Sequence, residues 1–458
     1  MNVLIVLTLT GIVILFSGIL NYRSLALPVA VIGILASILL NVMAWNSNQS
    51  VLNHMMVMDN YALAFSSLTL ATGLVLIILY SLVYSKTDVH YADVLALLIF
   101  ALIGVVVLTS FTHLVMLFLG IEILSLSLYI LAGINKKDLA SNEAAIKYFL
   151  MGSFSTGFLL FGIALVYGAS ATFDLTQIGY YVNSNINNLP GIFYVGIVLI
   201  LVSLLFKVAA VPFQFWTPDV YEGSPTLITA FMATVGKTAS FAAFYRLFIF
   251  SFSQVNHQWV ILIAVSSMAT ILIGNIAAIY QNGTKRMLAY SSVAHAGYML
   301  LAIAAVNELS QGSLLFYSTA YSLASLCAFA GVFAIQESTG SDNTESFNGL
   351  AKHNPVFALS ITIALLSLAG IPFTAGFFGK FYIFSSALTQ GYLWMVIVAV
   401  IGSFISIYYY FRPIINMYIK PGSEKLLDIS GPYKTILALL AGLIILLGVL
   451  PGLIAGLI

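Results

Sequence analysis

Residues 207–246 read KVAAVPFQFWTPDVYEGSPTLITAFMATVGKTASFAAFYR, and this stretch decides the fold. It places Lys207 in an apolar run and Pro212 five residues later; a short acidic turn and a second apolar run with Lys237 near its middle follow. A charged side chain inside hydrocarbon is costly, so such residues normally face a protein interior or a hydrated path and serve ion transfer. Two lysines on consecutive apolar segments beside a helix breaker therefore predict a functional site within a membrane.

The composition also indicates a membrane protein. Of the 458 residues, 61% are hydrophobic and 7% are charged, whereas about a quarter of the residues in soluble domains are charged. The net charge of +1 suggests no nucleic-acid partner, and the single Cys327 excludes disulfides, iron–sulfur clusters and cysteine-ligated metals within the chain. The sequence contains no nucleotide-binding motif, no HxxxH motif and no paired-haem pattern. We therefore expect no redox cofactor in this chain.

Fourteen apolar segments are long enough to cross a bilayer as helices, which takes about twenty residues each. They lie at 3–20, 26–44, 60–84, 92–109, 112–133, 140–168, 191–216, 224–251, 259–280, 286–306, 311–337, 354–388, 393–418 and 434–457. The first has neither a basic region before it nor a cleavage site after it, which favours a retained span over a signal peptide. The sequence therefore predicts an all-α, multi-pass protein forming a single membrane domain, 1–458. The sixth and twelfth spans are long enough to be tilted or interrupted.

Positive charge predicts the orientation of these spans. Eleven lysines and arginines fall in or next to the odd-numbered connections between spans, and none falls in the even-numbered ones. Because cytoplasmic loops are enriched in Lys and Arg, we expect the odd connections on the cytoplasmic side and both termini on the other side. The eleven residues are Arg23, Lys86, Lys136, Lys137, Lys285, Arg286, Lys352, Arg412, Lys420, Lys425 and Lys434.

The seventh and twelfth spans resemble each other. One reads LVSLLFKVAAVPFQFW and the other ITIALLSLAGIPFTAGFFGKFYIF, so Pro212 and Pro372 correspond. A proline within a span removes a backbone donor and clashes with the preceding turn, and broken helices at matching positions of two halves are typical of transporters. Because the breaks lie five spans apart, the sequence predicts two inverted five-helix repeats, 92–251 and 259–418, and a separate C-terminal helix at 434–457.

Glu122 lies in the middle of the fifth span, within FLGIEILSLSLYIL, with Ser125 and Tyr129 at i+3 and i+7 on the same helix face. Burial and a nearby cation act on the protonation of a carboxylate in opposite directions. A lysine that approaches and retreats would therefore make Glu122 a proton switch. The alternative is a static buried ion pair.

Lys207 and Lys237 lie on the seventh and eighth spans. Lysine, unlike arginine, can release its proton when it is buried, which suits both residues to proton transfer. For Lys207 the alternative is an ammonium group that only satisfies carbonyls freed at the break. The neighbours of Lys237 on one face of a regular helix are expected to be Thr226, Thr229, Ala233 and Ser240.

His295 lies centrally in the tenth span, with Ser291 and Tyr298 on its face. The ordinary pKa of histidine, about 6.5, suits a proton shuttle, and the alternative is a histidine that is merely satisfied in the core. Lys380 follows a run of glycines and Pro372 in the second broken span. For this lysine the alternative is a side chain that extends outward along the second half-helix.

Four more charged residues lie near the predicted cytoplasmic side. Glu143 and Lys147 form an i, i+4 pair at the start of the sixth span, which is most simply a helix-end pair. Asp219 and Glu222, in TPDVYEG, look like turn and cap residues. A role in proton uptake or coupling is the alternative for all four.

Five titratable residues fall at similar depth on five different spans: Glu122, Lys207, Lys237, His295 and Lys380. Residues placed by structural accident would scatter in depth. We infer a polar row parallel to the membrane plane, in which protonation of one site changes that of the next.

The motifs around these residues resemble a known family, the antiporter-like subunit N of proton-translocating NADH–quinone oxidoreductase (respiratory complex I), called subunit 2 in mitochondria. The similar motifs are GIEILSLSLYIL, NEAAIKYFLMGSFSTGFLLFG, FKVAAVPFQFWTPDVYEGSPTLITAFMATVGK, KRMLAYSSVAHAGYML and LAGIPFTAGFFGKFYIF. The turn PDVYEG is of the N type, whereas the related subunits L and M and multisubunit cation/proton antiporters typically carry a different turn. The resemblance extends from about the fourth span to the thirteenth.

By this resemblance, Glu122 matches the family's glutamate of span five and Lys207 its paired lysine of span seven. Lys237 matches the connecting lysine of span eight, and Lys380 matches the terminal lysine of span twelve, which exchanges protons with the far side. His295 lies in the family's span-ten motif. The family's fold has fourteen helices with two inverted five-helix units.

The resemblance implies a non-redox, proton-translocating subunit of NADH–quinone oxidoreductase in a bacterial inner membrane. It implies no cofactor in this chain, with flavin, iron–sulfur clusters and quinone in other subunits. The implied partners are the lipid bilayer and other membrane subunits of complex I, including subunit M and small membrane subunits. The main alternative is a subunit of a multisubunit sodium/proton antiporter, and weaker alternatives are an autonomous solute transporter and a purely structural scaffold.

Overall fold

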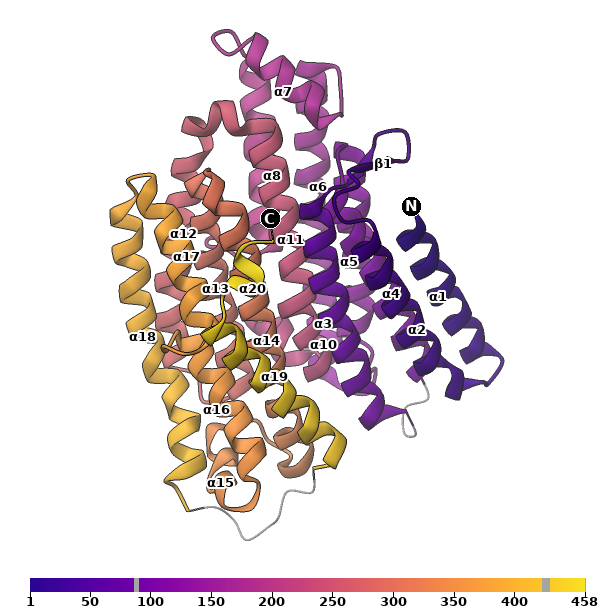
Figure 1. Cartoon of the computed structure of the whole chain (residues 1–458), viewed down its shortest axis with the longest axis vertical. Helices are drawn as coiled ribbons and strands as arrows, with labels where there is room; N and C mark the ends of the chain where they lie inside the picture. The colour runs from indigo at the N-terminus through magenta and orange to yellow at the C-terminus, as the bar shows by residue number, and fades with distance from the viewer. Residues whose placement is uncertain (86–89, 422–428, 458) are drawn as a thin grey trace. The chain divides into compact units, whose positions relative to one another are not determined.

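The protein is built almost entirely of helices. The structure, a computed structural model, describes residues 1–85, 90–421 and 429–457. The helices form two compact units, one comprising Met1–Ala209 with Val235–Leu262 and the other Ala210–Thr234 with Ile263–Leu457. Figure 1 shows that long helices make up each unit.

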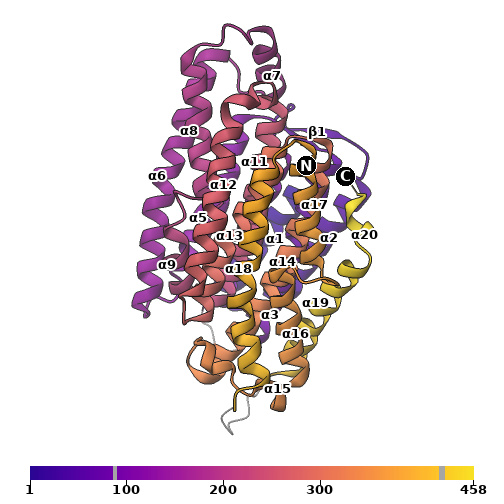
Figure 2. The same ribbon diagram turned by 90° about the vertical axis from the view of Figure 1, so that its left-hand side faces the viewer.

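The first unit contains α1 (Asn2–Ile19), η1 (Arg23–Leu25), α2 (Ala26–Met43), β1 (Gln49–Val51), β2 (Met56–Met58), α3 (Asn60–Tyr84), α4 (Tyr91–Ser110), α5 (Leu114–Ala132), α6 (Leu139–Ser170), α7 (Leu175–Ser184), α8 (Gly191–Lys207), α11 (Lys237–Phe252) and η3 (Ser253–Val255). α1 packs on α4, α4 on α5, and α6 along α8 (Figures 1 and 2). Small residues allow the last pair to approach closely, since a Cβ on Gly162 would lie 2.8 Å from the Gly196 carbonyl oxygen.

The second unit contains α9 (Trp216–Gly223), α10 (Thr226–Phe231), most of α12 (Asn256–Ile279), α13 (Thr284–Ala305), α14 (Glu308–Thr339), η4 (Thr344–Phe347), α15 (Leu350–His353), α16 (Pro355–Ala369), α17 (Ala375–Thr389), α18 (Leu393–Tyr418), α19 (Gly431–Val449) and α20 (Gly452–Ala455). The π-helix η2 (Met232–Gly236) lies between α10 and α11. α14 is central to this unit, because it packs against α13, α16, α17 and α19.

The predicted fold class is confirmed. Among the described residues, eleven helical segments are long and apolar enough to cross a membrane, and one of them, Thr226–Ile279, contains both the eighth and ninth predicted spans. Two shorter apolar helices, α8 and α16, begin the two interrupted spans. Counting Thr226–Ile279 as two spans and adding these helices gives the fourteen that were predicted. Of the residues that predict orientation, Lys86 and Lys425 lie outside the described part of the chain.

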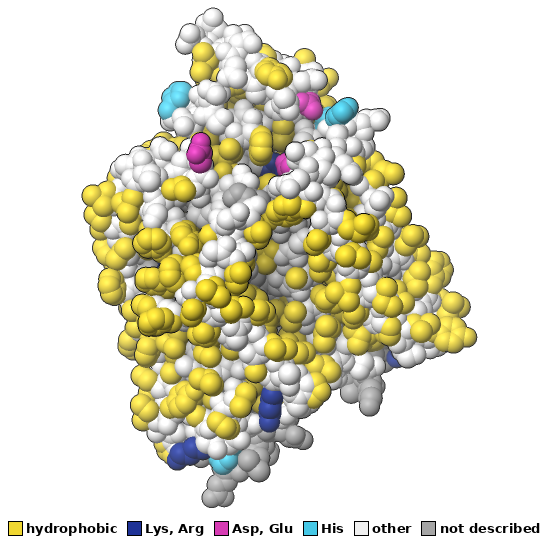
Figure 3. Space-filling model, in the orientation of Figure 1, with side chains coloured by type: hydrophobic (Ala, Val, Ile, Leu, Met, Phe, Trp, Pro, Cys, Tyr) yellow, Lys and Arg dark blue, Asp and Glu magenta, His cyan; other side chains and the backbone are white. Residues whose placement is uncertain are grey.

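The outer surfaces of these helices suit hydrocarbon. Large apolar side chains are exposed there, for example Phe16 on α1, Phe154 on α6 and Phe404 on α18. Figure 3 shows hydrophobic side chains over much of one face of the molecule. In water such a surface would associate or aggregate, so the pattern indicates that lipid or other membrane subunits cover it.

Two surface elements were not predicted from the sequence. The connection 169–190 contains α7, whose start is capped by Asp174, which accepts from the Gln177 N–H (2.9 Å). Between α2 and α3, the strands β1 and β2 pair antiparallel, with Gln49 opposite Met58. The long α6, for which a tilt or an interruption was considered, is continuous over 32 residues.

The break around Pro212 is held by hydroxyl groups of α12. α8 ends before this proline, α9 begins after it, and the Val211–Pro212 peptide bond is cis. The Val211 N–H donates to Thr270 Oγ1 (2.8 Å), and Ser266 Oγ donates to the Val211 carbonyl (2.6 Å). An unsatisfied backbone group is costly within a bilayer, so these two side chains stabilise the irregular segment.

At the break around Pro372, the backbone hydrogen-bonds to side chains of the same interrupted span. The Gly376 N–H at the start of α17 donates to Ser367 Oγ of α16 (3.0 Å). Gly376 leaves no room for a side chain, because an added Cβ would overlap the Ser367 carbonyl. The Ala369 carbonyl at the end of α16 accepts from Lys380 Nζ (2.9 Å). The predicted interruptions of the seventh and twelfth spans are therefore both present.

An unpredicted ion pair is buried in the first unit. Arg246 of α11 is 2% exposed, and its Nη2 donates to Asp59 Oδ1 (2.6 Å). The guanidinium also lies over the rings of Tyr61 and Phe250, 5.1 and 5.5 Å from their centroids. Asp59 additionally caps α3 by accepting from the Ala62 N–H (2.8 Å). The pair thus joins the start of α3 to α11.

We predict that Arg246→Ala destabilises the protein by about 3 kcal/mol, since removing one partner leaves a buried charge without its counter-charge. The double variant Arg246→Met/Asp59→Asn should lose clearly less stability, because it removes both charges and keeps most of the volume. Thermal unfolding of the purified protein in detergent measures both effects. Equal losses in the two variants would contradict this account of the pair.

Candidate functional site

Lys207 is the last residue of α8, and its ammonium group contacts polar side chains of α5. Nζ donates to Ser125 Oγ (2.9 Å) and to the Tyr129 hydroxyl (3.4 Å). These are the two polar residues that the sequence placed on one face with Glu122. Among the described residues no backbone carbonyl accepts from Lys207, so it does not serve to satisfy the carbonyls of the break. That alternative is wrong for this residue.

Glu122 lies one turn from Ser125 on α5 and is half-buried. Its charge is close enough to act on both Lys207 and Tyr129. Within the described part of the chain, however, no ion pair joins Glu122 to Lys207. The static ion pair considered from the sequence is therefore not formed, and Ser125 and Tyr129 take the ammonium group instead.

Lys237 is 3% exposed and begins α11 immediately after the π-helix η2. A π-helical turn contains an extra residue, so positions before and after it no longer follow the 3.6-residue period. The predicted face, which assumed a regular helix through this point, is therefore wrong for Thr226 and Thr229. Thr229 instead donates to the Tyr221 carbonyl (2.9 Å) within the second unit.

His295 of α13 is surrounded by hydroxyl groups from two other helices. Nδ1 lies 2.6 Å from the Tyr317 hydroxyl of α14, and Nε2 lies 3.1 Å from the Tyr410 hydroxyl of α18. The Tyr410 hydroxyl also contacts Ser291 Oγ. Both ring nitrogens are thus within hydrogen-bond reach of groups that donate and accept protons. His295 thus has two hydrogen-bond partners. The same contacts would also stabilise a histidine with a purely structural role.

Lys380 of α17 is 5% exposed. Its Nζ donates to the Ala369 carbonyl and lies 4.9 Å from the centroid of the Tyr298 ring. Outward extension of this side chain, considered from the sequence, is therefore wrong, because the ammonium group turns back to the helix break. The ring of Tyr298 also packs 5.8 Å from that of His295, so one tyrosine contacts both His295 and Lys380.

Tyr298 belongs to a further set of polar groups. Its hydroxyl accepts from Asn275 Nδ2 (3.2 Å) and from Ser403 Oγ (3.3 Å). Asn275 Oδ1 accepts in turn from the Tyr409 hydroxyl (2.9 Å). A cavity of about 210 Å³ lies beside Lys380 and includes Ser403 in its lining. Most of its other lining side chains are apolar, such as Phe381 and Phe404.

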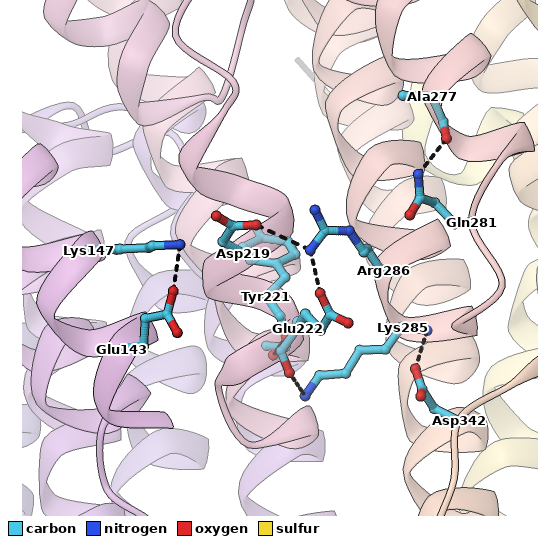
Figure 4. A network of polar contacts seen from close by, with 11 residues as sticks. Glu143, Lys147, Asp219, Tyr221, Glu222, Ala277, Gln281, Lys285, Arg286 and Asp342 are labelled. Atoms are coloured by element: carbon cyan, nitrogen blue, oxygen red, sulfur yellow. Dashed lines mark hydrogen bonds and ion pairs between the residues drawn. The ribbon is translucent and has the colours of Figure 1, made fainter. Parts of the chain in front are cut away.

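A second polar network joins α9 to α13 and is shown in Figure 4. Arg286 Nη1 lies 3.1 Å from Asp219 Oδ1 and also contacts Glu222 Oε2. Lys285 Nζ donates to the carbonyls of Glu222 (2.9 Å) and Ser224. The sequence suggested that Asp219 and Glu222 are turn and cap residues, but both lie within a helix. They belong to α9, which contains them between Trp216 and Gly223, and they bind a cation of α13.

Glu143 and Lys147 form the predicted pair along α6, with Nζ 2.7 Å from Oε1 (Figure 4). Their side chains are 65% and 34% exposed, respectively. An exposed i, i+4 pair contributes little to stability. The two residues are consequently accessible for proton exchange, but no described contact connects them to Glu122 or Lys207.

Comparison with known proteins places this geometry in a family. Residues 111–406 match the family described as NADH:quinone oxidoreductase/Mrp antiporter, TM. NADH-quinone oxidoreductase subunit N of Cytophaga hutchinsonii is 42% identical over 98% of each chain. A chain of respiratory complex I from Thermus thermophilus is 31% identical, with a TM-score of 0.86 over 99% of this chain and 98% of that one.

This chain belongs to the subunit N family of complex I. The Mrp complex from Dietzia sp. contains a similar chain, with a TM-score of 0.83 over 99% of this chain and 94% of that one. Since that chain is 20% identical, the likeness shows only a shared fold. The predicted resemblance to subunit N is therefore confirmed, and the chain is a multi-pass membrane subunit of the NADH–quinone oxidoreductase family.

Several residues of this candidate site were not predicted. Tyr317 and Tyr410 are 22 and 115 residues from His295, so no local pattern connects them to it. Asn275 and Ser403 lie on α12 and α18 and meet only at the Tyr298 hydroxyl. The sequence does carry a weak signal for these four residues. Each is a polar side chain within an apolar span, and such side chains usually face other protein segments and not lipid.

We predict that Arg286→Gln raises hydrogen–deuterium exchange of the α9 amides about two- to tenfold, because each exposed ion pair is worth about 0.2–1 kcal/mol. The variant loses the contacts to both Asp219 and Glu222. Arg23→Gln, which removes the same charge elsewhere, is the control and should leave α9 unchanged. Unchanged exchange in Arg286→Gln would show that α9 is held by its apolar packing alone.

Proposed function

We propose that the chain translocates protons as subunit N of a bacterial NADH–quinone oxidoreductase, along Glu122, Lys207, Lys237, His295 and Lys380. The observation that carries the proposal is the ammonium group of Lys207, which ends a half-helix and is bound by the neutral hydroxyls of Ser125 and Tyr129. The ammonium group binds to the two hydroxyls and not directly to the Glu122 carboxylate, which lies one helical turn from Ser125. That arrangement suits a reversible change of charge.

Glu122 and Lys207 act as a gate in this proposal. When the lysine lies close to Glu122, their attraction favours the charged form of both. When it moves to Ser125 and Tyr129, that attraction weakens and Lys207 can pass its proton on. Lys237, buried on α11, is the next acceptor in the first unit. Its protonation changes the free energy of protonation at neighbouring sites, so a charge change propagates.

His295 and Lys380 serve the second unit. The hydroxyls of Tyr317 and Tyr410 lie at the two nitrogens of His295, so one nitrogen of the neutral ring can accept a hydrogen bond while the other donates one, which suits His295 to accept a proton on one side and release one on the other. Lys380 then releases protons to the far side. Its contact with the Ala369 carbonyl supports a charged resting form, and breaking that contact would free the ammonium group for exchange.

Proton uptake is assigned to the side that carries most lysines and arginines. Glu143 and Lys147 are exposed there, and Asp219 and Glu222 bind Arg286 near the first break. We propose that these four residues supply or couple protons to Lys207 and Lys237. Both termini then lie on the opposite side of a bacterial inner membrane.

The assembly follows from the same proposal. In this proposal the inverted repeats 92–251 and 259–418 carry one broken helix each, and the C-terminal segment 434–457, expected to be one helix, contains most of α19 and the short α20. Flavin, iron–sulfur clusters and quinone belong to other subunits, whose chemistry drives this one. The proposed partners are subunit M and small membrane subunits. The alternative, a subunit of a sodium/proton antiporter, draws on the shared fold of the Mrp complex. Sodium-dependent transport without NADH-oxidising, flavin-containing partners would favour it.

Lys207→Ala and Lys237→Ala test the central claim. We expect each to lower proton pumping and NADH-coupled turnover roughly tenfold or more, as when a proton-transferring group is lost, while the complex still assembles. The measurement is the number of protons moved per NADH in proteoliposomes, and Lys352→Ala on α15 is the exposed control. Unaltered proton stoichiometry in both variants would contradict the assignment.

Ser125→Ala/Tyr129→Phe tests the gate. Without the two hydroxyls, Lys207 has no neutral partner, so we expect pumping to fall about tenfold, because a hydrogen bond to a charged group is worth about 1.5–3 kcal/mol. Ser127→Ala is the matched control, since Ser127 lies on the same helix and bonds to the Ile123 carbonyl instead (2.9 Å). Equal pumping in the double variant and the control would argue against this gate.

A further inference from the structure

A polar cavity lies at the end of α18 in the second unit, away from the proposed proton path. Its volume is about 350 Å³, and its lining includes Arg412, Asn416 and Lys420 from α18 and its end. Glu345 and Asn348, from η4 and the residue after it, complete the polar part of the lining. It differs in kind from the cavity beside Lys380, which is almost entirely apolar.

The cavity carries excess positive charge. Lys420 is exposed, and within the described chain neither it nor Arg412 forms an ion pair with a carboxylate. Arg412 is held in place by its Nη1, which donates to the carbonyls of Ile279 (3.0 Å) and Gln281 (3.1 Å). The remaining guanidinium donors stay available on a rigidly placed side chain. Among the described residues of the lining, the only carboxylate beside these two cations is that of Glu345.

The cavity also offers an acceptor that the protein leaves unused. Asn348 Oδ1 is buried and has no hydrogen-bond partner. A buried acceptor without a partner costs free energy, so a donor group seated in the cavity would be stabilised there. The nearby amide nitrogen of Asn416 donates to the Thr344 carbonyl (2.7 Å) and not to Asn348 Oδ1. The cavity therefore suits a ligand with both a negative charge and a hydroxyl group.

The position of the cavity indicates where such a ligand comes from. α18 presents Phe404 and Tyr408 outward along its length, and Tyr418 and Ile419 are exposed where it ends. Aromatic side chains at the end of a span mark the membrane–water interface. Basic pockets between membrane helices on the cytoplasmic side bind anionic lipid head groups. Ile415, 41% exposed, adds an apolar side chain to the lining.

We propose that this cavity binds the head group of an anionic phospholipid whose phosphodiester carries a hydroxyl-bearing substituent, as in phosphatidylglycerol. Arg412 and Lys420 bind the phosphodiester oxygens, and Asn348 Oδ1 accepts from the hydroxyl. The acyl chains lie outside the cavity, against the apolar surface of α18. The same charges would also attract free phosphate, which supplies no acyl chains.

The test uses the intact complex in nanodiscs that contain a photoactivatable phosphatidylglycerol in a phosphatidylcholine background. We expect the probe to label the segment 412–420, as read by peptide mass spectrometry. Lys420→Gln should reduce that labelling about fivefold, because one cation near a membrane surface contributes about 1 kcal/mol to binding an anionic lipid. Glu345→Gln should increase it. Lys136→Gln, an exposed lysine of the first unit, is the control and should change nothing.

Lys420 is exposed, so its replacement should not impair folding. Arg412 is not replaced in this test, because it also donates to the carbonyls of Ile279 and Gln281. The following results would overturn it: equal labelling by a phosphatidylcholine probe, labelling that Lys420→Gln leaves unchanged, or labelling that excess inorganic phosphate abolishes. The last would identify a site for soluble phosphate. A fall in labelling on Glu345→Gln would indicate a head group with an ammonium group and would also overturn the anionic assignment.

Discussion

A charged or polar group enclosed by apolar helices is stable only where another polar group meets it, and this constraint organises the structure. The lysines at the two helix breaks satisfy it differently. Lys207 donates to two hydroxyls of α5, whereas Lys380 donates to the carbonyl that ends α16. The backbone at the first break needs no lysine, because Ser266 and Thr270 of α12 already satisfy it.

The two units use different chemistry around their titratable residues. In the first unit Lys207 donates to two hydroxyls of α5, Ser125 and Tyr129, and among the described residues it forms no direct ion pair with Glu122. In the second unit His295 and Lys380 are connected through aromatic side chains, with Tyr298 contacting both. Hydroxyl groups and imidazole transfer protons with small movements, whereas separation of an ion pair needs a larger change in position.

Charges near the ends of the helices have other functions. Arg286 joins α9 to α13 through two acids, and Arg246 joins α11 to the start of α3. Arg412, which anchors α18 to the end of α12, leaves donors directed into an open polar cavity. Arginine suits these positions because it stays charged and donates in several directions from one planar group. The cations of the proposed proton path are lysines, which, unlike arginine, can lose their charge when buried.

The sequence by itself determined the span count, the broken helices at Pro212 and Pro372, the family and the choice of buried titratable residues. The spans, the breaks and the titratable residues depend on composition and on spacing within one segment, which hydrocarbon constrains strongly, whereas the family followed from the resemblance of its motifs. Only the tertiary structure decided which partners those residues meet. It brought Tyr317 and Tyr410 to His295, turned Lys380 back to Ala369, and placed a π-helix before Lys237 that disrupts the expected face. The physical reason is that a side chain's partners lie on other helices, and helix packing is settled by the whole core together and not by any one segment.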